Sequence, residues 1–351
     1  MSANAQEEIY VGGVSGCGQL AVAENSTMYR ADGGHVYIHS VGWDQRTTEA
    51  EKLGIIELWK DHKWGIEMGH STNNYTSRQN AYRTRYHNRG IRPAYITVNA
   101  YSSARVVGVE DWRKTVQAYR DLGISAETAV YATFEYQNMP DYWTTLENNY
   151  VSDRTDFQQV IEISGGMTID IPPTVYWRRM NNSNPAIRKY HDWILDAVKW
   201  AKDRGHRVGI IVSPNSSGTG YPNDTERFVQ VLRDNNALPD FFVVENYENK
   251  DESSYTNEVG NEDTPYHQLG TARLMQTDWF PEAVQSDGQG TVTGSWAGYD
   301  VWDFRYVDTA GWIGWIEVTN APFVYSLDAN IWMYLPESGV EPVGSWMYLL
   351  K

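Results

Sequence analysis

The chain has 351 residues, enough for one large α/β barrel with a small appendage or for two ordinary domains. Its net charge is −16, and a negative field of this kind opposes binding to the phosphates of nucleic acids. A single cysteine, Cys17, excludes an intramolecular disulfide and a cysteine-based metal site. The sequence contains no run of about 18 apolar residues, the length needed to cross a membrane as a helix.

The first 34 residues are rich in Gly and Ser and have no clear periodicity, so we expect an N-terminal extension over 1–34. Ala3-Asn4-Ala5 has the small-x-small form of a signal-peptidase site, which indicates a mature secreted protein. The glycine-rich stretch 12–18 is not followed by a helical pattern. It therefore predicts a turn and not a phosphate cradle, and we expect no nucleotide or other cofactor.

A strand–helix alternation begins at His35 and continues to about residue 310. The predicted strands are 35–39, 64–68, 92–99, 128–135, 167–171, 207–213 and 241–245. Helical patterns lie between them, at 48–59, 78–88, 111–122, 185–204 and 224–234. Parallel strands need a crossover, which a helix supplies, so this order predicts parallel pairing. Two segments are candidates for an eighth strand, 272–276 and 312–316.

Alternation within the strands separates an apolar face from a face that becomes polar towards the C-terminal end. In the strand 128–135, for example, Tyr131, Thr133 and Glu135 alternate with Val130 and Ala132. A doubly wound open sheet would show continuous apolar runs instead. The pattern predicts a (β/α)8 TIM-like barrel over 35–310, with a functional mouth at the C-terminal ends of the strands.

Carboxylates follow several of these strands at the end where a barrel gathers its functional residues. Glu245, Asp170 and Glu135 are the predicted catalytic residues, and Glu67 shares their interior face but is expected lower in the barrel. Glycoside hydrolysis normally needs two carboxyl groups. With 15 Trp and 24 Tyr, the chain also carries many flat aromatic faces suited to stacking on sugars.

Polar and aromatic residues that follow the same strands are predicted sugar contacts. They are Trp43, Asp44, His70, Asn99, Tyr176, Trp177, Arg178, Asn215 and Tyr247. The pair Arg178-Arg179 either binds a carboxylate or sulfate of an acidic glycan or pairs with a neighbouring acid such as Asp170. The sequence leaves both interpretations open.

No metal centre is expected. The sequence lacks the His-x-His and His-Glu-x-x-His spacings. His35 and His39 share one face of a predicted strand, but without a third ligand they favour a structural role.

After residue 310 the pattern changes to short aromatic segments separated by Gly, Pro, Ser and Asn. The unit Trp-Met-Tyr-Leu occurs at 332–335 and again at 346–349. This predicts a small antiparallel β appendage, 311–351, packed on the barrel. The segment resembles the Trp/Tyr-repeat endings of many secreted bacterial proteins.

Residues 35–310 resemble the secreted bacterial (β/α)8 glycoside hydrolases. Many of these enzymes carry an acid/base Glu on strand four and a nucleophile Glu on strand seven, which the resemblance places at Glu135 and Glu245. Phe134 precedes Glu135, where the large clan carries Asn. An Asp on strand five with a Glu on strand seven, Asp170 with Glu245, fits equally well and is the pair we prefer.

The predicted function is therefore that of a secreted, monomeric glycoside hydrolase that cleaves a polysaccharide, with an acidic or sulfated algal or bacterial glycan as one option. A polysaccharide lyase is the first alternative, with His70, Tyr95 or Tyr247 as base and Arg178 neutralising a uronate carboxylate. A non-catalytic carbohydrate-binding protein is the second.

Overall fold

The computed structural model describes most of the chain in 17 segments of ordered backbone. These are 8–14, 16–68, 75–99, 109–121, 129–135, 151–180, 190–213, 224–245, 259–264, 267–279, 292–296, 299–302, 306–308, 315–318, 323–326, 331–335 and 348–349. They belong to two compact units, Met1–Val284 and Gln285–Lys351. Each unit is described by itself.

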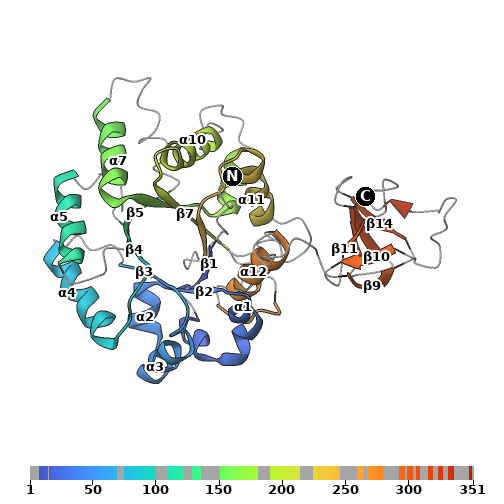
Figure 1. Cartoon of the computed structure of the whole chain (residues 1–351), viewed down its shortest axis with the longest axis horizontal. Helices are drawn as coiled ribbons and strands as arrows, with labels where there is room; N and C mark the ends of the chain where they lie inside the picture. Colours follow the sequence, from blue (N-terminus) through green and yellow to red (C-terminus); the bar gives the residue numbers. More distant parts are fainter. Residues whose placement is uncertain are drawn as a thin grey trace. The chain divides into compact units, whose positions relative to one another are not determined.

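The first unit is a closed barrel of eight parallel strands (Figure 1). The strands are β1 Glu8–Val11, β2 His35–Ile38, β3 Trp64–Glu67, β4 Tyr95–Asn99, β5 Ala129–Glu135, β6 Gly166–Asp170, β7 Arg207–Val212 and β8 Phe241–Val244. Neighbours in sequence are neighbours in space, and β1 closes the ring by pairing with both β2 and β8. The predicted (β/α)8 barrel is confirmed.

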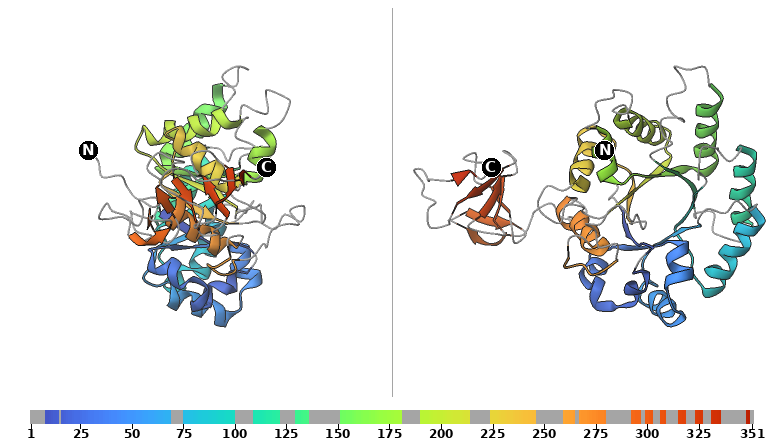
Figure 2. Two further views of the ribbon diagram at one scale, coloured as in Figure 1. Left: turned by 90° about the vertical axis from the view of Figure 1, so that its right-hand side faces the viewer. Right: turned by 180° about the vertical axis from the view of Figure 1, so that it is seen from behind.

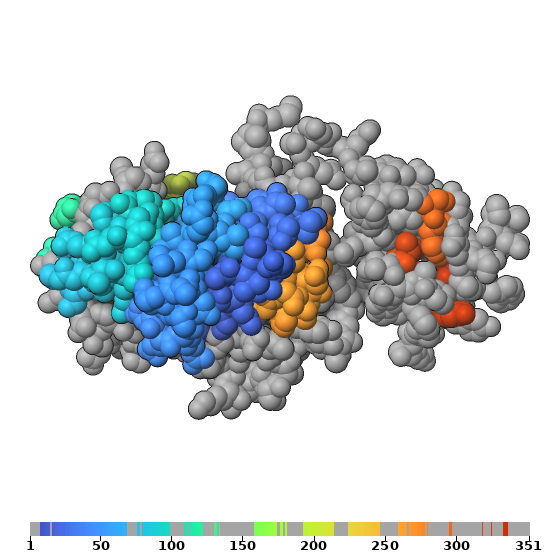
Figure 3. All heavy atoms as spheres, turned by 90° about the horizontal axis from the view of Figure 1, so that it is seen from below, coloured from blue at the N-terminus to red at the C-terminus, as the bar shows by residue number. Residues whose placement is uncertain are grey.

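Helices surround the strands on the outside (Figures 1 and 2). They are α1 Thr27–Ala31, α2 Ser40–Arg46, α3 Glu49–Leu58, α4 Tyr75–Arg85, α5 Val109–Arg120, α7 Val151–Ser164, α8 Pro173–Met180, α10 Tyr190–Lys202, α11 Asp224–Asp234 and α12 Gln268–Leu274. On the face seen in Figure 3, the segments 16–68 and 75–99 form a continuous blue-to-cyan layer. Among the described residues, no helix combines the length and hydropathy needed to cross a membrane.

The expected N-terminal extension over 1–34 is wrong, because this range contains the first strand of the barrel. β1 has only four residues, followed by Gly12-Gly13, so its local pattern is weak and its pairing is entirely long-range. Neither candidate for the eighth strand belongs to the barrel. The segment 272–276 is helical, and 312–316 overlaps β12 (Trp315–Glu317) of the second unit.

The interior of the barrel is filled by aromatic rings, so it is a packed core and not a pore. Tyr95 lies at its centre, with ring-centroid distances of 4.6 Å to Phe241 and 5.0 Å to Tyr10. Tyr37 and Tyr131 complete this aromatic floor. The residues two or four positions further along the same strands have the same inward direction and reach the C-terminal mouth.

The second unit is a seven-stranded antiparallel sheet, in keeping with the predicted β appendage. Its strands are β9 Val292–Trp296, β10 Tyr299–Trp302, β11 Tyr306–Asp308, β12, β13 Phe323–Ser326, β14 Ile331–Tyr334 and β15 Tyr348–Leu349. The two Trp-Met-Tyr-Leu units contribute β14 and β15, which pair with each other. The unit begins at Gln285 and not at the expected residue 311.

Tyr29 connects the short closing strand to its neighbour. It is fully buried on α1, and its hydroxyl donates to the carbonyl oxygen of Ile9 at 2.7 Å. The backbone N–H of His35 donates to the same hydroxyl at 3.1 Å. Tyr29 therefore connects β1 and β2, whose backbone ladder is the shortest between neighbouring strands of the barrel.

We predict that Tyr29→Phe lowers the free energy of unfolding by about 1–3 kcal/mol, because it removes the partner of two buried backbone groups. Tyr82→Phe is the matched control. The Tyr82 hydroxyl is also buried but has no hydrogen-bond partner, so its removal should change stability by less than about 0.5 kcal/mol. Urea unfolding of the three proteins measures the difference, and equal losses in both variants would contradict this role of Tyr29.

Candidate active site

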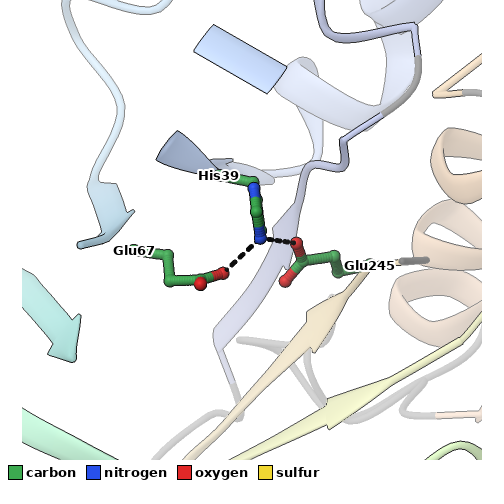
Figure 4. A group of neighbouring side chains, drawn as sticks. All are labelled: His39, Glu67 and Glu245. Carbon is green, nitrogen blue, oxygen red and sulfur yellow. Dashed lines mark ion pairs between the residues drawn. The ribbon is translucent and has the colours of Figure 1, made fainter. Parts of the chain in front are cut away.

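Three ionisable side chains meet at the C-terminal mouth of the barrel. His39 lies between Glu67 and Glu245 (Figure 4). Its Nε2 atom is 2.9 Å from Glu67 Oε2 and 3.8 Å from Glu245 Oε1. All three residues are buried, with 7% of Glu67 and 8% of Glu245 exposed. We call these three residues the mouth cluster.

Strand register brings the mouth cluster together. Ile38 is in register with Ile66, which places His39 beside Glu67, the last residue of β3. Glu245 directly follows β8 and is fixed by its backbone N–H, which donates to the carbonyl oxygen of Val212. Between them lies β1, which is followed by Gly12, where a Cβ would collide with the backbone of Tyr37. The close approach of the two backbones at this point therefore requires glycine.

Glu245 is a carboxyl group that keeps its proton at neutral pH. Burial raises its pKa to about 8, with further contributions from the charges of Glu67 and Asp170 and opposition from His39. Its Oε1 atom is buried, and no donor among the described residues forms a hydrogen bond with it. The site thus holds an acid with one oxygen that no described residue pairs.

His39 is subject to two opposing influences. Burial disfavours its charged form, but Glu67 and Glu245 outweigh burial and raise its pKa to about 9. At the same time its Nδ1 accepts the backbone N–H of Val41 at 3.1 Å and caps α2. An imidazolium carries a proton on both nitrogens and cannot accept. In the observed geometry Nδ1 accepts and Nε2 donates to Glu67, and the second proton that the raised pKa favours would break the cap.

The mouth cluster has a composition that could coordinate a divalent cation. One ligand atom from each residue lies within 4.8 Å of the other two. However, a histidine that binds a metal through Nε2 carries its proton on Nδ1 and donates it to a carbonyl or carboxylate. Here Nδ1 faces the N–H of Val41, a donor. The donor set therefore fits proton chemistry better than metal coordination.

The structure brings the predicted acids to the same end of the barrel. Asp170 is the last residue of β6, is half-buried, and its charge raises the pKa values of both Glu245 and His39. Glu135 ends β5 in register with Asp170, and its side chain lies outside the described residues. Glu67, expected lower in the barrel, lies instead at the mouth in direct contact with His39.

Two of the predicted sugar contacts lie in the helical layer around α2. Trp43 is only 1% exposed and packs on Tyr86, with a centroid distance of 5.9 Å, so neither of its faces is open to a sugar. Asp44 forms an ion pair with Arg85 at 2.7 Å. Both residues were predicted as contacts because they follow the strand 35–39, and α2, which begins at Ser40, carries them into the helical layer.

Two more predicted contacts lie between α8 and α11. Tyr176 is buried against Phe228 at a centroid distance of 4.8 Å. Trp177 donates from Nε1 to the carbonyl oxygen of Asp224, and its ring lies under Arg227. Because α8 begins at Pro173, these residues are on a helix that packs against its neighbour, and the predicted sugar contacts are wrong here as well.

The other five predicted contacts fall, wholly or by their side chains, outside the described residues. His70, Asn215 and Tyr247 lie outside the described residues. Asn99 ends β4 and Arg178 is on α8, with side chains outside the described part of the structure.

The sequence prediction missed His39 as a site residue. The sequence does show that His39 lies two residues after Tyr37, so both side chains point into the barrel. That His39 lies beside Glu67 follows only from the register between β2 and β3, which the sequence does not give.

The barrel has a strand before the first predicted one, so the strand numbers used in the resemblance to glycoside hydrolases change. With β1 at Glu8–Val11, Glu135 ends the fifth strand and Glu245 follows the eighth. The fourth and seventh strands end at Asn99 and Val212. The placement of Glu135 and Glu245 on strands four and seven is therefore wrong.

No protein-family model matches the sequence, and no curated protein matches it. Solved structures that it resembles include a GH30 endoxylanase from Clostridium papyrosolvens, with 7% identity, a TM-score of 0.47, and coverage of 94% of this chain and 80% of that one. A GH18 chitinase from Pseudoalteromonas aurantia has 12% identity, a TM-score of 0.44, and coverage of 71% and 96%. A 2,3-dimethylmalate lyase has 10% identity, a TM-score of 0.39, and coverage of 69% and 76%. Likenesses at this level say nothing about activity, so function has to be argued from the site.

We predict that the stability of the protein falls as the pH rises from about 4.5 to about 8. The folded state holds the proton of Glu245 up to about pH 8, whereas an ordinary carboxyl group, with a pKa of 4.5, has lost it. Glu245→Gln removes this titration, so its stability relative to the wild type should increase by a few kcal/mol across this interval. Unfolding curves at several pH values measure the difference, and parallel pH profiles would show that Glu245 titrates normally.

We also predict that divalent metals bind no tighter to the wild type than to a variant without His39. The Val41 N–H blocks the tautomer that coordination requires. Thermal unfolding with EDTA, Zn²⁺ or Mn²⁺ should therefore give the same shift for the wild type and for His39→Gln. A stabilisation by Zn²⁺ that disappears in His39→Gln would contradict this prediction.

Proposed function

We propose that the protein is a glycoside hydrolase in which Glu245 is the general acid. The observation that carries the proposal is the buried carboxyl group of Glu245 at the mouth of a (β/α)8 barrel, with one oxygen within 4.8 Å of an oxygen of Glu67, in surroundings that raise the pKa of Glu245. Cleavage of a glycosidic bond requires a proton on the leaving oxygen, and an acid with a pKa near the working pH supplies it best.

The environment of Glu245 supports this assignment. Burial disfavours the carboxylate form of Glu245, and no donor among the described residues reaches its Oε1 atom. The proton is therefore not committed to a structural hydrogen bond through that oxygen. Asp170, the partner predicted from sequence, contributes the negative field that helps to keep the proton on Glu245.

We include a polysaccharide substrate and secretion in the proposal. The short segment Ala3-Asn4-Ala5 supports secretion, which suits an enzyme that acts on a large glycan. Arg178 supports an acidic or sulfated glycan as one option. A monomer is the simplest assembly consistent with a complete site on one chain.

Of the three candidate bases for a polysaccharide lyase, Tyr95 is in an unsuitable position. Tyr95 is fully buried in the aromatic floor between Tyr10 and Phe241, and burial raises its pKa well above the usual value. A phenol in that position has no access to a substrate at the mouth and is a poor base. His70 and Tyr247 lie outside the described residues.

We predict that Glu245→Gln lowers kcat on the substrate about 10²–10⁴-fold, because the amide cannot donate the proton. The substrate is found by measuring new reducing ends on a panel of neutral, uronate-containing and sulfated polysaccharides. In the wild type, kcat/KM should fall on the alkaline side near pH 8, where Glu245 loses its proton.

Glu57→Gln is the control, because Glu57 is exposed on α3 and pairs only with Lys60 in the described contacts. It should retain full activity. Wild-type turnover in Glu245→Gln would remove Glu245 from the mechanism. Binding of a glycan without any release of reducing ends or unsaturated products would favour the non-catalytic alternative.

A further inference from the structure

We infer that Glu67, and not Asp170, is the nucleophile that works with Glu245, and that the enzyme retains the configuration of the anomeric carbon. This inference rests on the proposed function. It assigns a catalytic role to a residue that the sequence pattern placed below the site.

The separation of the two carboxyl groups carries the stereochemical part. One oxygen of Glu67 and one of Glu245 lie within 4.8 Å of each other. Retaining glycosidases hold their carboxyl groups about 5–5.5 Å apart, whereas inverting enzymes need about 6.5–9.5 Å to admit a water molecule. The nearest oxygens of Glu67 and Glu245 are thus closer than the separation that inverting enzymes need, which favours a retaining mechanism.

The hydrogen bonds divide the roles between the two acids. Glu67 accepts the Nε2–H of His39 at 2.9 Å, and the cap on Val41 fixes the imidazole in that tautomer. A donor of this kind stabilises the carboxylate and orients it, as a nucleophile requires. Glu245 lies 3.8 Å from the same nitrogen, too far for a hydrogen bond, and its buried Oε1 has no partner. Of the two acids, Glu245 is therefore the one whose proton is not shared with His39.

The reaction balances with these two residues and water. In the first step an oxygen of Glu67 bonds to the anomeric carbon, the glycosidic C–O bond breaks, and the proton of Glu245 moves to the leaving oxygen. In the second step a water molecule attacks the same carbon and gives a proton to Glu245, and the bond to Glu67 breaks. Both acids return to their starting states.

Asp170 fits a supporting role. It lies at the end of β6, four strands around the ring from β2 and two from β8. Among the described residues, the group of ligand atoms within 4.8 Å of one another contains Glu67 and not Asp170. Its charge still acts on Glu245, which it helps to keep protonated. Asp170→Asn should therefore shift the alkaline limb of the pH profile to lower pH without removing turnover.

Two measurements on the full-length protein test the inference. The first follows the newly formed reducing end by proton NMR during hydrolysis of the polysaccharide found on the panel. The expected first product has the anomeric configuration of the substrate. Inversion would overturn the inference and leave the glycoside hydrolase proposal standing.

The second measurement compares Glu67→Ala with Asp170→Ala in the presence and absence of sodium azide. Glu67→Ala should lose about 10³-fold or more in kcat. Azide, which fits the space left by the carboxylate, should restore turnover and give a glycosyl azide of inverted configuration. Rescue of Asp170→Ala instead, or full activity of Glu67→Ala, would overturn the assignment. If Glu67→Ala does not fold, Glu67→Gln replaces it in the kcat comparison, and circular dichroism checks the fold of both.

If the wild type hydrolyses no polysaccharide and no aryl glycoside, the proposed function fails, and the inference fails with it. If hydrolysis depends on Glu245 but not on Glu67, only the inference fails. The two results are therefore distinguishable.

Discussion

The arrangement at the mouth depends on the cost of removing several carboxyl groups from water together. Desolvation of an unpaired carboxylate is expensive, and neighbouring negative charges add to the cost. The protein meets it in two ways. Glu67 receives a hydrogen bond from His39, and Glu245 keeps its proton. One environment thus places a carboxyl group that accepts a hydrogen bond from His39 beside one whose pKa is raised, which is the asymmetry that acid catalysis with a nucleophile requires.

Closure of the barrel by β1 is the structural condition for this asymmetry. His39 and Glu245 follow the strands on either side of β1, so the pairing of β1 with both β2 and β8 brings them to neighbouring positions at the mouth. The strand contributes no catalytic group of its own. Tyr29 and the backbone ladders to β2 and β8 hold it in place. A segment that looks like an unstructured extension in the sequence therefore decides whether the site can form.

Much of the barrel was predictable from alternation within the strands, because inward and outward residues differ in polarity. The positions of Glu245 and Asp170 at the C-terminal ends of their strands were predicted this way. Contacts that depend on strand register could not be predicted in this way. The pairing of β1 with β8 and the contact of His39 with Glu67 both link segments far apart in the chain. The aromatic contacts failed for another reason. Trp43 and Tyr176 follow their strands closely, but α2 and α8 begin at once and carry both residues into the helical layer.

The two ends of the barrel interior show how surroundings decide the chemistry of a glutamate. Glu8, at the N-terminal end of β1, would have its pKa raised by burial. Lys63 at 2.6 Å, Tyr10 at 2.7 Å and Arg207 at 2.6 Å instead lower it below its usual value. Among the described residues, Glu245 at the C-terminal end has only the more distant His39, at 3.8 Å, to oppose burial, and its pKa rises to about 8. Full pairing makes Glu8 a structural residue, whereas weaker pairing favours the protonated form of Glu245. The same barrel therefore separates stability and reactivity along its axis.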